Sequence, residues 1–193
     1  PVELQPLKRV GNGLTGNRLV GGNGIDMLVD GDQAYPAMIS AIDGARETVG
    51  MCSYIFDDDT VGQSFVEALC RAAKRGVQVR LLVDGIGAIG FGPLLRRRIH
   101  DSGGRVSAFW PRGRWLKHPG INLRNHRKIL VVDGVTAFTG GLNVSDRHGT
   151  RPDESSPESR DAHFRIRGPV VRHLVETFAD DWELATGESL DLS

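Results

Sequence analysis

The chain has 193 residues, enough for one domain with a substantial core or at most two small ones. Its composition is that of an ordinary globular protein, and its 24 basic residues balance its 24 acidic ones. A formal net charge of zero disfavours a protein that binds nucleic acid through bulk electrostatics, although it permits a local basic patch. No stretch approaches the roughly 20 apolar residues of a membrane span, and no signal-peptide pattern is present.

The first 24 residues are rich in Gly and Asn and are predicted to form a flexible arm. We expect a single domain over residues 25–186 and a short tail over residues 187–193. Apolar runs that end at turn residues predict strands: Met27–Asp30, Val49–Phe56, Val77–Asp84, Arg105–Trp110, Ile129–Val132, Val135–Thr139 and His163–Ile166. Apolar residues at helical spacing predict four helices: Ala34–Thr48 with Asp32 as its cap, Thr60–Arg75 capped by Asp59 or Thr60, Leu94–His100 and Val170–Leu184.

Strands that alternate with helices and are followed by a hairpin indicate an α/β sandwich around a mixed sheet. The hairpin is marked by Asp133-Gly134, a strong two-residue turn signal between two apolar runs. Thr150–Arg160 is polar and contains proline, so it is predicted to be a surface loop. Cys52 and Cys70 lie in apolar stretches without a metal-ligand pattern, and we interpret them as buried thiols.

The segment Asn125–Asp133 contains the pattern His-x-Lys-x4-Asp. Side chains two apart in an extended strand share a face, so His126 and Lys128 are expected to point the same way. A neutral imidazole can attack phosphorus, and an ammonium beside it can hold the non-bridging oxygens. Asp133 falls on the opposite face and at the hairpin tip, so we assign it a structural role.

Three residue groups downstream are candidates for supporting this pair. Gly140-Gly141 would let backbone approach a ligand, although a tight turn is an equally good interpretation. Asn143 can donate an amide hydrogen to a phosphoryl oxygen. Asp161 can accept the Nδ1 proton of His126, although the residues alone favour a surface ion pair with Arg160.

The order of these residues resembles the signature of the phospholipase D superfamily: His126, Lys128 and Asp133, then Gly140-Gly141 and Asn143. Further segments resemble its bacterial cardiolipin synthase branch: Leu28–Gly31, Tyr54–Phe56, Arg80–Asp84, Arg160–Pro169 and Phe178–Trp182. The resemblance covers about Asn17 to Trp182, which is nearly the whole chain.

The resemblance implies an α/β/α sandwich and a two-step phosphodiester exchange that needs neither metal nor cofactor. One histidine forms a covalent phosphohistidine, while a second protonates the leaving alkoxide and then deprotonates the acceptor. His126 fits either role. Lys128, Asn143 and Gly141 would then bind the phosphate, and Asp161 would orient His126.

The chain departs from the cardiolipin synthases in one respect, because they carry two His-x-Lys-x4-Asp copies and this sequence has one. A second half-site would come from a homodimer mate or from a missing C-terminal half, and the resemblance favours a fragment that holds the N-terminal half. A catalytically incomplete half-domain is the non-enzymatic alternative.

The loop before the motif, Pro111–Pro119, mixes bases with Trp115 and could border the mouth of the site. Such a loop can contact phospholipid headgroups, grip a nucleic-acid backbone or be simply solvated. We expect a phosphatidyltransferase that acts on phospholipid, cytoplasmic or peripheral at the inner face of a membrane. A homodimeric phospholipase D or endonuclease is the alternative, with nucleic acid the less favoured substrate.

Overall fold

The computed structural model describes residues 5–15, 19–109, 125–148 and 161–191. Its strands are β1 (Gly24–Val29), β2 (Thr48–Ser53), β3 (Gln78–Asp84), β4 (Arg105–Phe109), β5 (Ile129–Val132), β6 (Thr136–Gly140) and β7 (Ala162–Arg167). Its helices are α1 (Gln5–Thr15), α2 (Asp30–Gly44), α3 (Thr60–Lys74), α4 (Pro93–Asp101) and α5 (Val171–Thr186), with a 3-10 turn, η2, at Asp146–His148. The predicted loops Pro111–Pro119 and Thr150–Arg160, and Trp110, lie outside the described residues.

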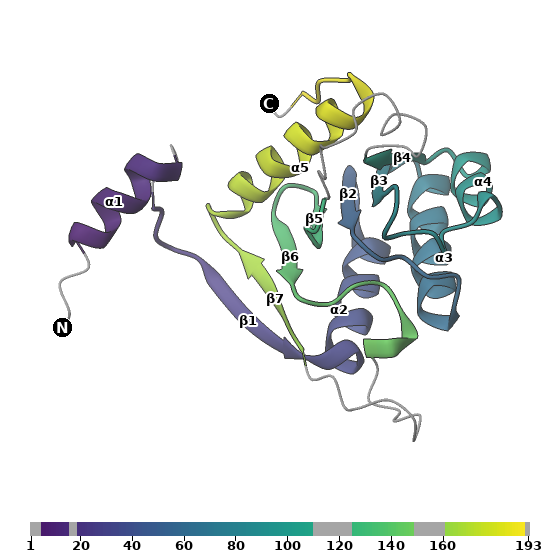
Figure 1. The fold of residues 1–193 in the computed structure, drawn as a ribbon, viewed down its shortest axis with the longest axis horizontal. Coiled ribbons are helices and arrows are strands. Elements are labelled where there is room, and N and C mark those ends of the chain that lie inside the picture. Colours follow the sequence, from purple (N-terminus) through teal and green to yellow (C-terminus); the bar gives the residue numbers. More distant parts are fainter. Residues whose placement is uncertain (1–4, 16–18, 110–124, 149–160, 192–193) are drawn as a thin grey trace.

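The strands form one sheet in the order β1-β7-β6-β5-β2-β3-β4 (Figure 1). Strands β2, β3 and β4 run parallel, as expected for strands joined by helical crossovers. The pairs β2–β5, β5–β6, β6–β7 and β7–β1 are antiparallel. The predicted mixed sheet is therefore confirmed, and β5 lies at the junction of its two halves.

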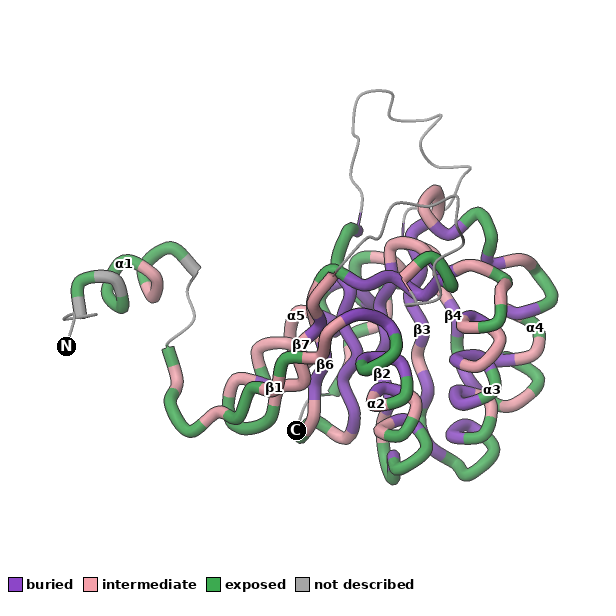
Figure 2. Tube along the Cα trace, turned by 90° about the horizontal axis from the view of Figure 1, so that it is seen from below, coloured by how far each residue is buried: buried purple, intermediate pink, exposed green. Residues whose placement is uncertain are grey.

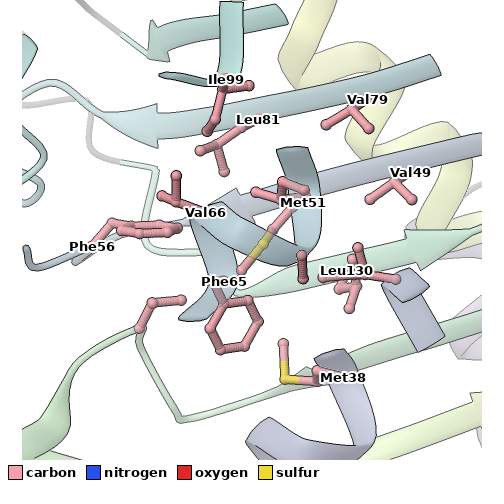
Figure 3. Close-up of a cluster of buried hydrophobic side chains, with 14 of the residues drawn as sticks. Met38, Val49, Met51, Phe56, Phe65, Val66, Val79, Leu81, Ile99 and Leu130 are labelled. Atoms are coloured by element: carbon pink, nitrogen blue, oxygen red, sulfur yellow. The ribbon is translucent and has the colours of Figure 1, made fainter. Parts of the chain in front are cut away.

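Helices cover both faces of the sheet, and alternate residues of each strand enter different cores. Val49, Met51 and Leu81 point to the face covered by α2, α3 and α4, where the larger apolar core lies (Figure 3). Buried residues are concentrated in the central strands and in the helices packed against them (Figure 2). Cys52 and Leu82, one residue further along, point to the face covered by α5. The α/β/α sandwich is confirmed, with two apolar cores that hold the central strands from both sides.

Two helices differ from the sequence prediction: α2 begins earlier than predicted, and α1 was not predicted. Helix α2 starts at Asp30 rather than after Asp32, because its first residues, Asp30-Gly31-Asp32, have the composition of a turn and lack apolar periodicity. Gln5–Thr15, predicted as a flexible arm, forms α1 at a distance from the sheet (Figure 1). Leu7, Val10 and Leu14 have the spacing of an amphipathic helix, which the glycines between them obscured.

Asp133 ties the β5–β6 hairpin to the connection between α2 and β2. Asp133 and Gly134 have φ angles of 50° and 64°, and the Val135 N–H donates to the Val132 carbonyl at 3.1 Å. The Asp133 carboxylate accepts three backbone N–H groups, from residues 46, 47 and 48, at 2.9, 2.8 and 2.9 Å. Burial would raise the pKa of this carboxyl, but the three donors outweigh it and hold the pKa below its usual value.

Replacing this carboxylate should destabilise the fold. We expect Asp133→Ala to lower the free energy of unfolding by about 2 kcal/mol, because three backbone donors lose a charged acceptor. Asp133→Asn should lose less, since asparagine tolerates the positive φ and keeps one oxygen. Urea unfolding at pH 7 would measure both variants. Equal stability of all three proteins would show that these hydrogen bonds contribute nothing.

Candidate active site

His126 and Lys128 lie at the edge of the sheet where β2 and β3 end. Strand β5 runs antiparallel to β2, so the residues just before β5 meet the carboxyl ends of the parallel strands. Residues 125–128 precede the regular strand, which begins at Ile129. His126 and Lys128 therefore lie at the end of the sheet opposite the Asp133 turn.

The two predicted reactive side chains are in contact. The Lys128 Nζ lies 3.1 Å from Nδ1 and 3.3 Å from Nε2 of His126, and it donates to the His126 carbonyl at 2.9 Å. Lys128 is only 6% exposed, whereas His126 is exposed to solvent. Burial lowers the pKa of Lys128, although the negative charge of Asp161 opposes this effect. The site thus presents an accessible imidazole above a buried amine.

Tyr54 lies beside both members of the pair. Its ring centroid is 4.5 Å from that of His126, with the planes tilted by 46°. The Lys128 Nζ lies 5.2 Å from the Tyr54 ring centroid, within the range of a cation–π contact. The aromatic ring therefore forms one wall of the site.

Buried carboxylates from two distant elements hold Asn125 in front of the motif. Asp84, at the end of β3, accepts the Asn125 backbone N–H at 3.1 Å. Asp181, on α5, accepts the Asn125 side-chain amide at 2.8 Å and pairs with the Arg127 guanidinium. Asp84 and Asp181 are 2% and 5% exposed. Their position within apolar segments of the sequence indicates buried carboxylates, but it does not indicate that both bind Asn125.

Gly140 and Gly141 make room for side chains of the neighbouring strand. A Cβ added to Gly141 would lie 2.1 Å from the Asp161 Oδ1, and one added to Gly140 would lie 2.8 Å from the His163 Nδ1. The close approach predicted for a ligand is thus made by the protein itself. At Gly140 the Ala162 carbonyl oxygen and the His163 Cα would be closer still, at 2.4 and 2.6 Å, because β6 pairs with β7 here. Both positions therefore require glycine.

Asp161 does not make the hydrogen bond to His126 that the sequence predicted. Its Oδ1 accepts the Ala162 backbone N–H at 2.7 Å, so the carboxylate is turned toward the start of β7 and Gly141. Its backbone N–H donates to Asp30 at 2.9 Å. Burial lowers the pKa values of Lys128 and His163, and the negative charge of Asp161 partly opposes this lowering, so Asp161 acts on the site through its field.

Asn143 is held in the loop after β6 by contacts at both its side chain and its backbone. Its Oδ1 accepts the Ile55 N–H at 3.1 Å, and its carbonyl accepts the Tyr35 hydroxyl at 2.7 Å. Asn143 lines a small cavity together with Lys128 and His163. The structure therefore brings Asn143 to the buried side of the His126–Lys128 pair.

His163 was not predicted as a site residue. It is 1% exposed, and neither of its ring nitrogens has a hydrogen-bond partner. Burial lowers its pKa to about 4, with the charge of Lys128 adding to the shift and that of Asp161 opposing it. The only signal in the sequence was a histidine at an inward-facing position of a predicted strand, which is more often structural.

Within the described ranges, no group of three or more His, Cys, Asp or Glu side chains is arranged to hold a metal ion. None of the helices in the described part of the chain is long and apolar enough to cross a bilayer.

Comparison with known proteins gives consistent relatives. A family model described as cardiolipin synthase, PLD-like domain, matches residues 38–182. Cardiolipin synthase A of Pseudomonas entomophila is 40% identical over 164 residues, which are 85% of this chain and 34% of that protein. The protein of the same name from Pseudomonas syringae is 38% identical over 172 residues, 89% of this chain and 36% of that protein. The chain spans about a third of the length of these relatives.

Solved structures share the fold. Nuc from Salmonella typhimurium, described as a phospholipase D family member, has a TM-score of 0.66 at 22% identity over 85% of this chain and 97% of that one. NucT from Helicobacter pylori has a TM-score of 0.65 at 17% identity, over 85% and 98% of the two chains. At these identities the likeness shows the fold alone.

The buried imidazole of His163 predicts a pH-dependent stability. Between its unfolded pKa near 6.5 and its folded pKa near 4, the unfolded chain binds a proton that the folded chain excludes. The stability that depends on a neutral His163 is therefore fully present above pH 6.5 and is lost as the pH falls toward 4. The loss due to this residue is about 3 kcal/mol.

Urea unfolding at pH 7, 5.5 and 4.5 would test this, with His163→Gln as the comparison. We expect the wild-type protein to lose more stability over this range than the variant, which has no titrating group at this position. The difference isolates His163 from carboxyl groups such as Asp133 that also destabilise the protein in acid. Parallel pH profiles would refute the burial of a neutral imidazole.

Proposed function

The chain belongs to the phospholipase D superfamily, in its cardiolipin synthase-like branch, and we propose that it supplies one half of a phosphatidyltransferase active site. The observation that carries this proposal is the contact between the exposed His126 and the buried Lys128 Nζ, at 3.1 and 3.3 Å from the two ring nitrogens. An accessible nitrogen nucleophile beside a cation is the arrangement that phosphodiester exchange requires.

The proposed reaction has two displacements at phosphorus. In the first, an imidazole nitrogen of one half-site attacks, an N–P bond forms, and the P–O bond to the leaving alcohol breaks as the second half-site's histidine donates its proton to the alkoxide. In the second, the acceptor alcohol gives its proton to that histidine, its oxygen attacks phosphorus, and the N–P bond breaks. With water as acceptor, the same steps amount to hydrolysis.

Two further residues support the phosphate in this scheme. Lys128 holds the non-bridging oxygens by its charge, and it stands where charge increases during each displacement. Asn143 lies on the same side and offers its amide hydrogens, because its Oδ1 is already used by the Ile55 N–H. Gly141 contributes indirectly, by admitting Asp161 next to the loop. Asp161 contributes a negative charge that favours the ammonium form of Lys128.

The second half-site is proposed to come from a homodimer mate or from the other half of a longer protein. The relatives are about three times as long as the matched region, which supports the second source. The match to almost the whole of two solved chains shows that a single module with this fold can form most of a chain, which is compatible with the first source. The proposed substrate is a phospholipid, reached from the surface of a membrane.

Turnover of labelled phosphatidylglycerol in vesicles, with glycerol as acceptor and a chelator present, would test the proposal. We expect His126→Ala to lower the rate about 1,000-fold and Lys128→Ala about 100-fold. His100→Ala, on the exposed side of α4, is the matched control and should leave the rate unchanged. Full activity of His126→Ala, or loss of wild-type activity in chelator, would overturn the mechanism.

Two further experiments identify the source of the second half-site and the substrate. A specific activity that rises with protein concentration, together with a dimer in sedimentation, would indicate the homodimer. Plasmid DNA incubated under the same conditions tests the alternative, a homodimeric phosphodiesterase of nucleic acid. Cleavage of DNA without turnover of lipid would replace the phospholipid with nucleic acid as the substrate.

A further inference from the structure

His163 is a buried polar side chain whose bonding is incomplete. It is 1% exposed and both of its ring nitrogens are without partners. Nearly all buried polar groups in proteins are hydrogen-bonded to protein or to ordered water, so two unpaired nitrogens on one ring require an explanation. The space between His163 and the His126–Lys128 pair provides that explanation.

The sheet places His163 and Lys128 in one row, with Gly140 between them. Gly140 pairs with His163, and Ile129 pairs with Thr139, so Lys128 stands opposite Gly140 at the start of β5. A Cβ on Gly140 would lie 2.4 Å from the Ala162 carbonyl oxygen, 2.6 Å from the His163 Cα and 2.8 Å from the His163 Nδ1, so the backbone of β7 and the imidazole together occupy the position that a side chain would fill. The absence of a side chain in the middle of the row opens the way from His163 to Lys128.

A cavity of about 10 Å³ lies between these residues, roughly the room that one water molecule needs. Its lining includes five residues with polar side chains: Tyr35, Ser53, Lys128, Asn143 and His163. The Tyr35 hydroxyl already donates to the Asn143 carbonyl at 2.7 Å, and the Ser53 hydroxyl donates to the Ile55 carbonyl at 2.6 Å. Those two hydrogens are thus committed elsewhere.

The remaining groups are complementary. The ammonium of Lys128 has three hydrogens, and its contacts with His126 account for two of them, one to the carbonyl and one to the ring. A neutral imidazole offers one acceptor and one donor. One water molecule in the cavity can therefore accept from Lys128 and donate to His163.

We propose that His163 is a positioning residue for Lys128, joined to it through one water molecule held in this cavity. The inference rests on the proposed function, in which Lys128 holds the phosphate. The bridge fixes the ammonium through a contact that does not involve His126, so the charge stays in place whether or not phosphate is bound. The low pKa of His163, about 4, keeps its ring neutral and able to accept near neutral pH.

The ammonium protons of Lys128 report on the bridge without any need for turnover. The chain has four lysines, so the side-chain NH3+ signals can be assigned by single substitutions in nitrogen-15 NMR. We expect the Lys128 protons to exchange slowly with solvent and to show a cross-peak to a long-lived water. The protons of Lys74, exposed at the end of α3, provide the reference for fast exchange. Exchange of Lys128 as fast as that of Lys74 would overturn the proposal.

Two substitutions separate hydrogen bonding from packing. His163→Leu keeps an apolar side chain of similar size but removes both nitrogens, and we expect Lys128 exchange to accelerate about tenfold or more. His163→Gln restores an acceptor and should stay within about threefold of the wild type. His100→Leu is the control for replacing a histidine elsewhere. Unchanged exchange in a folded His163→Leu protein would refute the bridge, and if that variant does not fold, the wild-type cross-peak decides.

Binding of inorganic phosphate, followed on the Lys128 signal, separates this proposal from the proposed function. We expect the dissociation constant to rise about tenfold in His163→Leu and to recover in His163→Gln. A bridge that is present in a protein that does not bind phosphate would contradict the proposed function and leave the bridge standing. Equal phosphate affinity in wild type and His163→Leu would contradict the positioning role while the proposed function stands.

Discussion

The burial of one amine, that of Lys128, is the constraint around which the rest of the site is arranged. A charged group in an apolar interior is costly unless its surroundings supply acceptors and opposing charge. Here the His126 carbonyl and ring, the face of Tyr54 and the field of Asp161 surround the amine. The same contacts fix the position of the amine relative to the exposed imidazole. The contacts that stabilise the buried amine are therefore the same contacts that the proposed chemistry needs.

Strand β5 can carry this site because carboxylates hold it at both ends. Asp133 receives three backbone N–H groups at one end, and Asp84 and Asp181 hold Asn125 just ahead of the other. Between these two ends, both faces of the strand pack against apolar cores. Because a displacement of about 1 Å at a reacting group can reduce a rate strongly, the proposed reaction would depend on this fixing.

Much of the site could be predicted from local sequence, but its supporting contacts could not. The spacing of His126 and Lys128 indicated that they meet, and they do. Gly140-Gly141 was interpreted either as an approach for a ligand or as a tight turn, whereas the atoms that lie against the pair belong to residues 161–163, at least 20 positions further along the chain. Asp161 was expected to accept a hydrogen bond from His126, whereas its Oδ1 accepts the Ala162 N–H. Both differences depend on which segments become neighbours, which periodicity does not specify.

The sequence by itself determined most of the elements, the mixed sheet and the proximity of His126 to Lys128, because those follow from periodicity, turn residues and the order of a short motif. Only the tertiary structure decided what lies beneath that motif. The register of β5, β6 and β7 sets His163 in the same row as Lys128 and across Gly140, although 35 residues separate the histidine from the lysine in the chain. Strand pairing brings together residues that are far apart in the sequence, so the register of these strands could not be deduced from either segment alone.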